Sequence, residues 1–212
     1  MSQQSKVAVI GAGVMGEALI AALISSGVNP EQITISEKRE ERAQELIAQY
    51  SIKAAPLATN VAEAEALLLV VKPQDMASVL AEIKGSINPA SVVISFAAGK
   101  TISFISNALG TGNPVVRVMP NTPTLVGEGM AAASMGTGVS AAQREFILGF
   151  LGATGKVIEV SEELQDAVTA TSGSGPAYFF AFVEAMVAGA KELGLSDQDA
   201  TTLTIQTIVG AA

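Results

Sequence analysis

A glycine-rich turn is the first stretch of the chain whose residue types could do chemistry. Gly11, Gly13 and Gly16 form a G-x-G-x-x-G pattern between an apolar run at 7–10 and a helical pattern at 15–26. The first glycine allows a tight turn, the second lets backbone approach a pyrophosphate, and the third lets helix and strand pack closely. Free N–H groups at the start of such a helix attract phosphate. The predicted dinucleotide-binding residues of this turn are Gly11, Ala12, Gly13, Val14, Met15 and Gly16.

An acidic residue follows the second apolar run, which covers 33–35. Glu37 stands where an acid holds the ribose hydroxyls of NAD in such folds. Its neighbours Ser36, Lys38 and Arg39 could instead hold the 2′-phosphate of NADP, or could simply be the solvated start of the next helix. The residues leave both nucleotides open, with NADP(H) the favoured cofactor and NAD(H) possible.

Small or rigid residues also follow three later apolar runs. Each cluster alone fits a turn or a helix start. Because the carboxyl ends of parallel strands meet at one edge of a sheet, the clusters together favour a long cofactor lying across several strands. The predicted cofactor residues at these ends are Val71, Lys72, Pro73, Ala97, Ala98, Gly99, Met119, Pro120 and Asn121.

A second Gly/Ser-rich stretch runs directly into a proline at a helix first turn. Backbone N–H groups and two serine hydroxyls would then face one point, which suits a carboxylate or the nicotinamide side of a cofactor. The alternative is a flexible linker between two domains. The predicted substrate-pocket residues are Ser172, Gly173, Ser174, Gly175 and Pro176.

The order of apolar runs and helical patterns predicts the fold that holds these residues. Near-continuous apolar runs indicate strands buried on both faces of a parallel sheet, and helical patterns lie between them. This alternation is typical of an α/β protein with a Rossmann-type doubly wound sheet. The expected strands are 7–10, 33–35, 67–71, 92–96, 115–119 and 156–160, and the expected helices in between are 15–26, 40–50, 74–84 and 102–109.

Strand signals stop after the last of these runs. Ser140 and Gln143 form a capping box that opens a helix to about residue 151, and helices are expected at 176–193 and from 196 onward. We expect a dinucleotide-binding domain at 1–162 and an all-helical substrate and dimerisation domain at 163–212. The last helical pattern has no stop signal, so we expect the chain to be a truncated form of a longer protein.

Composition excludes several classes of function. The 212 residues include no histidine and no cysteine, which rules out a Ser-His-Asp triad, a cysteine nucleophile and the usual zinc sites, so no metal is expected. A net charge of −8 argues against nucleic acid and anionic membranes as partners. The first apolar run is too short for a signal peptide or a transmembrane helix, which favours a cytoplasmic protein.

Several of these motifs together resemble one family, the pyrroline-5-carboxylate reductases. The resemblance runs through the whole chain and is most specific in the two later motifs. The motifs are Ile10–Gly16, Val71–Gln74, Phe96–Gly99, Arg117–Pro123 and Ser172–Tyr178.

The resemblance implies reduction of 1-pyrroline-5-carboxylate to L-proline by hydride from NAD(P)H, the last step of proline biosynthesis. It places Lys72, Pro73, Ala97 and Pro176 along the cofactor and the loop at 172–175 at the substrate. It also implies a donor threonine beyond Ala212 and a homodimer that assembles into a larger ring. Two alternatives are a related dehydrogenase acting on a hydroxyacid or another imine, for which Lys191 would have to be catalytic, and a nucleotide-sensing scaffold without activity.

Overall fold

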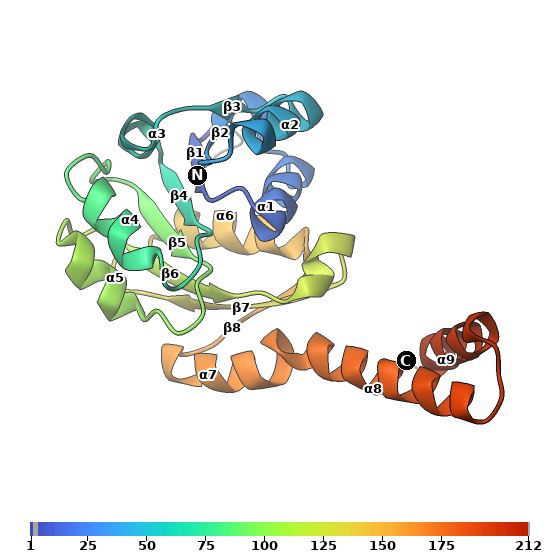
Figure 1. Ribbon diagram of the computed structural model, residues 1–212. Coiled ribbons are helices and arrows are strands. Elements are labelled where there is room, and N and C mark those ends of the chain that lie inside the picture. The colour runs from blue at the N-terminus through green and yellow to red at the C-terminus, as the bar shows by residue number, and fades with distance from the viewer. Residues whose placement is uncertain (2–3, 212) are drawn as a thin grey trace. The chain divides into compact units, whose positions relative to one another are not determined.

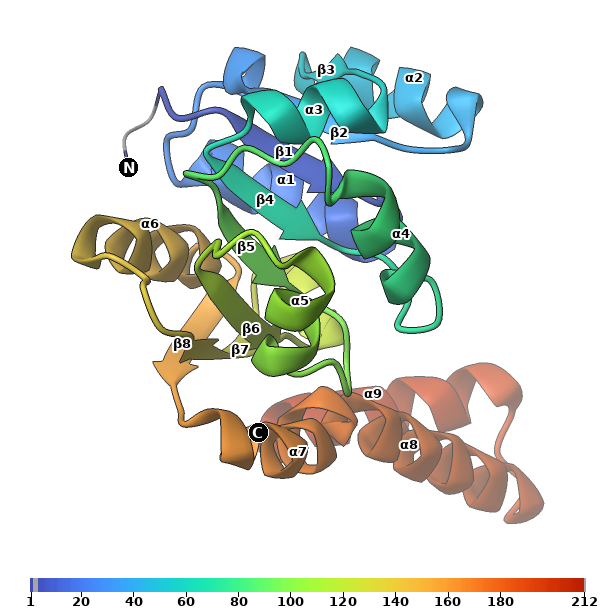
Figure 2. The same cartoon turned by 90° about the vertical axis from the view of Figure 1, so that its left-hand side faces the viewer.

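The computed structural model describes Met1 and residues 4–211. Within this range the chain forms two compact units, Met1–Gly173 and Ser174–Ala212. The first unit contains the sheet and the glycine-rich turn, and it is shown with its layers in Figures 1 and 2.

One eight-stranded sheet organises the first unit. Its strand order is β3-β2-β1-β4-β5-β6-β7-β8, so the order reverses between β1 and β4 as in a doubly wound sheet. Strands β1 to β6 are parallel to one another, β7 is antiparallel to β6, and β8 is parallel to β7. The strands are β1 (Val7–Ile10), β2 (Ile33–Ser36), β3 (Lys53–Ala54), β4 (Ala66–Leu69), β5 (Val92–Ser95), β6 (Val115–Met119), β7 (Gly129–Met135) and β8 (Gly155–Glu159).

Helices cover both faces of this sheet. Successive strand side chains alternate between two apolar clusters; in β1, Val7 and Val9 join one and Ala8 and Ile10 the other. The first cluster is completed by α1 (Val14–Ser25), α2 (Glu40–Tyr50) and α6 (Ala141–Gly152). The second is completed by α3 (Leu57–Glu63), α4 (Met76–Ile83) and α5 (Ile102–Leu109), which lie in front of the sheet in Figure 2. The Rossmann-type sheet predicted from the sequence is confirmed.

Local sequence signals, such as caps and glycines, predicted most ends of the helices and strands to within a few residues. The capping box of Ser140 and Gln143 is formed at the start of α6, and Gly27 follows α1 with a φ of +99°. Pro73 was expected to start a helix, but α4 begins only at Met76, because residues 73–75 form a turn in which Asp75 N donates to Lys72 O. The sequence analysis missed β3, α3 and β7. Strand β7 is rich in alanine, and its pairing with β6 and β8 stabilises it rather than its own propensity.

The segment 162–173 packs on the sheet of the first unit, although the sequence analysis grouped most of it with the helical region. It forms η3 (Glu162–Leu164), α7 (Gln165–Val168) and the π-helix η4 (Thr169–Gly173). Gln165 is fully buried, and its Nε2 donates to Ser134 Oγ and Ala132 O at 2.8 and 3.2 Å. The expected loop at Ser172 and Gly173 is thus wrong, since hydrogen bonds of a short π-helix hold both residues.

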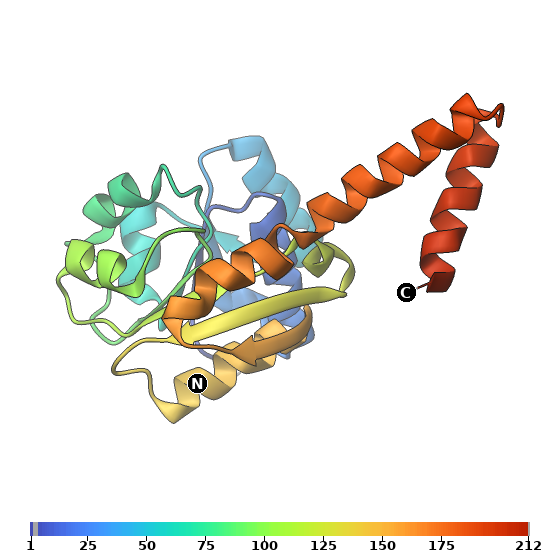
Figure 3. The same cartoon turned by 90° about the horizontal axis from the view of Figure 1, so that it is seen from below.

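The second unit consists of α8 (Gly175–Glu192) and α9 (Asp197–Ala211). Figure 3 shows the two helices as a hairpin. Pro176 lies in the first turn of α8, as predicted. Many large apolar side chains of this unit are exposed: Tyr178, Phe179, Phe180, Phe182, Leu193, Leu203, Ile205 and Val209. Across the described residues, the helices are too short or too polar to span a membrane.

Candidate functional site

The glycine-rich turn joins β1 to α1 at a place where a side chain would collide with backbone. Gly11 has a φ of +89°, and its N–H donates to Ser36 O at 3.1 Å. A Cβ on Gly11 would lie 2.8 Å from Val70 O, and a Cβ on Gly16 would lie 2.3 Å from Gly11 O. Gly13 is the N-cap of α1, and a Cβ there would meet nothing within 4 Å. Strand and helix therefore touch at Gly11 and Gly16, while the turn stays open at Gly13, the position at which phosphate approaches backbone.

Glu37 lies directly against this turn. Its Oε2 accepts a hydrogen bond from Ala12 N at 3.0 Å, and its Oε1 accepts from Arg39 N and Nε, both at 3.1 Å. Burial raises the pKa of the Glu37 carboxyl, but the hydrogen bonds from Arg39 and Ala12 outweigh it, so the pKa lies below its usual value. An ionised carboxylate thus lies beside the turn, where it can accept a hydrogen bond from a ligand hydroxyl.

A second carboxylate, Glu17, ties α1 to α2 behind the turn. It accepts hydrogen bonds from Arg42 Nη2 and, at 3.0 Å, from Tyr50 OH, while Arg42 Nε donates to Ala12 O at 3.3 Å. The pKa of the Glu17 carboxyl is lowered, chiefly by the hydrogen bond from Arg42, against the effect of burial. The sequence analysis missed this group, which fixes the carbonyl side of the turn.

A long cleft opens beyond the carboxyl ends of β1, β2 and β4. Its volume is about 720 Å³, within the usual range for small-molecule and cofactor sites. Predicted cofactor residues that line it are Gly11, Gly13, Ser36, Glu37, Lys38, Arg39, Val71 and Lys72. Several other lining residues were not predicted, because their segments carry no motif; these are Ala55, Pro56, Leu57, Asp75, Val79 and Glu82.

A short hollow of about 330 Å³ shares Val70, Val71 and Lys72 with the long cleft. Its other lining residues are Met15, Phe96, Met119, Pro120, Asn121, Thr122 and Gly173. Asn121 connects two segments at this hollow: its Oδ1 accepts from Met130 N at 2.8 Å, and its Nδ2 donates to Ser172 O at 3.3 Å. A Cβ on Gly173 would lie 2.5 Å from Met119 Cε, so a larger residue there would require the Met119 side chain to move.

The remaining predicted residues do not line the cleft or the hollow. Ala12 contributes its N–H to Glu37, Gly16 is buried in α1, and Ala97 is only 3% exposed. Ser174, Gly175 and Pro176 belong to the second unit. The others outside both linings are Val14, Pro73, Ala98, Gly99 and Ser172, whose carbonyl oxygen accepts from Asn121 Nδ2. Among the described residues there is also no group of three or more acidic side chains that could hold a metal ion.

The chain is similar to known proteins along almost its whole length. A family described as NADP oxidoreductase coenzyme F420-dependent matches residues 6–99, and one described as pyrroline-5-carboxylate reductase dimerisation matches residues 162–212. A pyrroline-5-carboxylate reductase from Corynebacterium melassecola is 43% identical over 210 residues, which are 97% of this chain and 78% of that protein.

Solved structures agree. A pyrroline-5-carboxylate reductase from Coxiella burnetii superposes with a TM-score of 0.88 at 32% identity over 98% of this chain and 78% of that one. A pyrroline carboxylate reductase from Plasmodium falciparum with NADP bound gives a TM-score of 0.85 at 27% identity over 99% and 78% of the two chains. Fold, motifs and relatives coincide along the sequence, and the chain belongs to the pyrroline-5-carboxylate reductase family.

Proposed function

We propose that this protein reduces 1-pyrroline-5-carboxylate to L-proline by hydride transfer from NAD(P)H, the last step of proline biosynthesis. One observation carries the proposal: the long cleft at the glycine-rich turn shares Val70, Val71 and Lys72 with the short hollow, which Asn121 and Gly173 also line. Two neighbouring cavities with a shared wall suit a dinucleotide with its phosphates at the turn and its reacting ring in the hollow. Relatives over the full chain are reductases of this substrate by name.

The side chains around the hollow suit a reaction that needs little general acid–base catalysis by the protein. The reduced nicotinamide supplies the hydride, and a protonated cyclic imine is already electrophilic. Met15, Phe96 and Met119 give the hollow apolar walls, and Asn121 donates a hydrogen bond to the π-helix that carries Ser172 and Gly173. The residues therefore act mainly by holding donor and acceptor in a reactive geometry, which is consistent with a chain lacking histidine.

The direct test is an assay of the full-length protein with NADPH or NADH and pyrroline-5-carboxylate. We expect oxidation of the nucleotide that depends on the imine and yields proline, measured by the loss of nicotinamide absorbance and by amino-acid analysis. Nucleotide binding without turnover of this substrate would contradict the proposal and would direct the search to other imines and to hydroxyacids.

For the cofactor, we propose that NADP(H) is favoured and that NAD(H) is also used. Lys38 and Arg39 line the cleft, and the Arg39 side chain is 65% exposed, so it is free to turn from Glu37 to a 2′-phosphate. The ionised Glu37 favours NAD(H) instead, because its carboxylate accepts a hydrogen bond from a ribose hydroxyl and repels a 2′-phosphate. The preference for NADP(H) is therefore expected to be modest.

Replacing Glu37 with glutamine is expected to raise the ratio of kcat/KM for NADPH to that for NADH about tenfold, a change of about 1.4 kcal/mol. The amide oxygen still accepts from Ala12 N, while the negative charge is gone. Glu41→Gln is the matched control, since Glu41 is an exposed acid of α2 outside the cleft lining, and it should leave the ratio unchanged. An unchanged ratio in Glu37→Gln would show that Glu37 does not govern the choice of cofactor.

We also propose that the protein is a homodimer. The family match for dimerisation covers residues 162–212, and the exposed aromatic side chains of α8 give a surface of the kind that a partner subunit covers. The larger ring and the cytoplasmic location stay predictions of the sequence analysis.

A further inference from the structure

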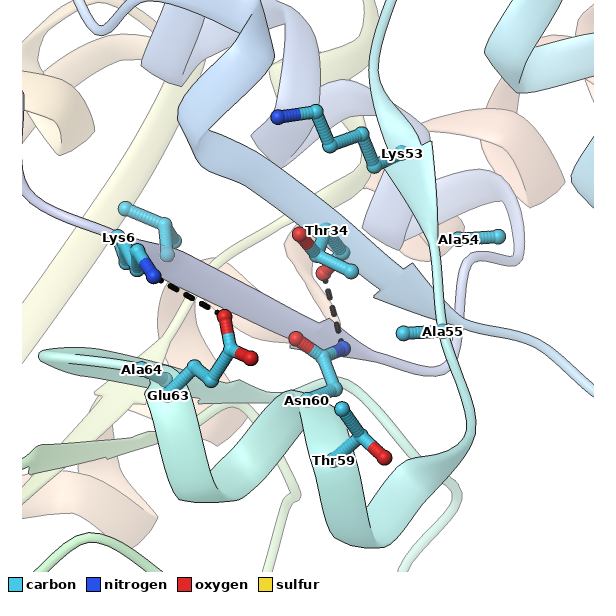
Figure 4. A pocket seen from close by; sticks show the side chains of 10 residues that line it. Lys6, Thr34, Lys53, Ala54, Ala55, Thr59, Asn60, Glu63 and Ala64 are labelled. Atoms are coloured by element: carbon cyan, nitrogen blue, oxygen red, sulfur yellow. Dashed lines mark hydrogen bonds and ion pairs between the residues drawn. The ribbon is translucent and has the colours of Figure 1, made fainter.

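A buried amide, Asn60, stands behind the long cleft without lining it. Asn60 lies in α3 and is only 4% exposed. Its Nδ2 donates to Thr34 O and to Ser36 Oγ, each at 3.0 Å, so both amide protons are used. Figure 4 shows its side chain turned toward Thr34, at a small hollow of about 170 Å³ that Lys6 and Lys53 also line. Asn60 therefore fastens α3 to the last residues of β2.

Ser36 passes this connection on. Its Oγ donates to Ala55 O at 2.9 Å, and a hydroxyl has one proton to give. The same oxygen must therefore accept the hydrogen bond from Asn60 Nδ2, so the donor and the acceptor of both hydrogen bonds are fixed. The relay runs from Asn60 through Ser36 to Ala55, and it leaves Ser36 without a proton to offer to a ligand.

The end of this relay is a wall of the long cleft. Ser36, Ala55, Pro56 and Leu57 line the cleft beside Glu37, Lys38 and Arg39. This wall has little support of its own, because β3 is a two-residue edge strand whose side chains are exposed. Beyond β3, Ala55 N donates to Ile35 O at 3.1 Å, and the Ser36 hydroxyl provides the second tie between this segment and β2.

We propose that Asn60 is a positioning residue for the adenosine half of the dinucleotide. It does not touch the nucleotide; it orients Ser36 and thereby holds the segment 55–57 where the cleft needs its wall. The inference rests on the proposed function only in taking the long cleft as the nucleotide site. A purely structural role would lower stability but leave the nucleotide affinity of the folded protein unchanged.

The test replaces Asn60 with leucine, which is close in volume and has no donor. Dissociation constants for NADPH, ADP-ribose and reduced nicotinamide mononucleotide are measured by fluorescence and calorimetry well below the unfolding temperature. We expect binding of NADPH and of ADP-ribose to weaken about 5- to 20-fold, the effect of roughly one lost interaction, and binding of the mononucleotide to stay the same. In the full reaction KM for the nucleotide should rise while kcat stays within about twofold.

Asn113→Leu is the matched control. Asn113 is 6% exposed, and its Nδ2 donates to Asn88 O and Ser91 O, both at 2.9 Å, at the amino end of β6. It should lose stability to a similar degree with no change in nucleotide binding. A double-mutant cycle with Ser36→Ala tests the relay. The dissociation constant of the double variant for NADPH should be no larger than that of the single variant that binds NADPH less tightly.

Three results would overturn the proposal. These are NADPH affinity within twofold of wild type in folded Asn60→Leu, equal weakening of the two nucleotide fragments, and additive losses in the cycle. Failure of the wild-type protein to bind any of the three ligands would instead contradict the proposed function.

Discussion

Gly16→Ala is expected to weaken NAD(P)H binding about a hundredfold, a loss of about 2.8 kcal/mol of binding free energy. The added Cβ would lie 2.3 Å from Gly11 O, which is backbone, and Gly11 is itself held by its hydrogen bond to Ser36 O. Helix α1 must therefore move away from the turn, and its N-terminal N–H groups move with it. Nucleotide titration by fluorescence, with thermal unfolding measured on the same samples, checks the result.

Gly149→Ala is the matched control, because Gly149 also lies inside a helix, α6, but a Cβ there would meet nothing within 4 Å. Alanine is the better helix former by up to about 1 kcal/mol, so this variant should bind nucleotide normally and be slightly more stable. Gly13→Ala separates the two effects further, since it should keep its stability and lose affinity through contact with the pyrophosphate. Wild-type affinity in Gly16→Ala would show that the turn is not the phosphate site.

Glu162→Leu is expected to lower the free energy of unfolding by about 2–3 kcal/mol, because it leaves a buried cation short of a partner. The Arg117 side chain is 5% exposed, and its Nη1 lies 3.7 Å from Glu162 Oε1. The same oxygen accepts from Ile102 N at 2.6 Å, at the start of α5. Asp166 alone would then face the guanidinium, at 3.3 Å from Nη2, and its own side chain is 91% exposed. Thermal unfolding should show a fall of roughly 5–10 °C in Tm.

The double variant Arg117→Met with Glu162→Leu is expected to recover much of this loss, because an apolar pair replaces the two charges. Lys6 and Glu63 form an exposed ion pair at 3.0 Å, and Glu63→Leu should leave Tm nearly unchanged. Additive losses in the double variant would show that Arg117 and Glu162 contribute independently. The effect of Glu162→Leu on catalysis should follow its effect on stability, because Glu162 lines neither the long cleft nor the short hollow.

Residues of the candidate site were easiest to predict where the backbone geometry requires one residue type. Gly11 and Gly16 allow backbone approaches that any Cβ would block, so a motif of glycines signals them directly. Glu37, which lines the long cleft, was singled out because it follows a recognisable strand. Asn60 and Gln165 carried no signal, because each gains its role from strands distant in sequence: β2 for Asn60, and β6 and β7 for Gln165.

The sequence by itself determined the parallel core of the sheet, the helices between its strands and the glycine-rich turn, because these depend on apolar runs, caps and φ angles that neighbouring residues set. Only the tertiary structure decided that alanine-rich β7 is a strand, that 162–173 packs on the sheet, and that 55–57 form a wall of the long cleft. Pairing and burial across many residues supply the free energy of these three features, and local propensity contributes little. The glycine-rich turn is thus a local property of the chain, and the shape of the cleft around it is not.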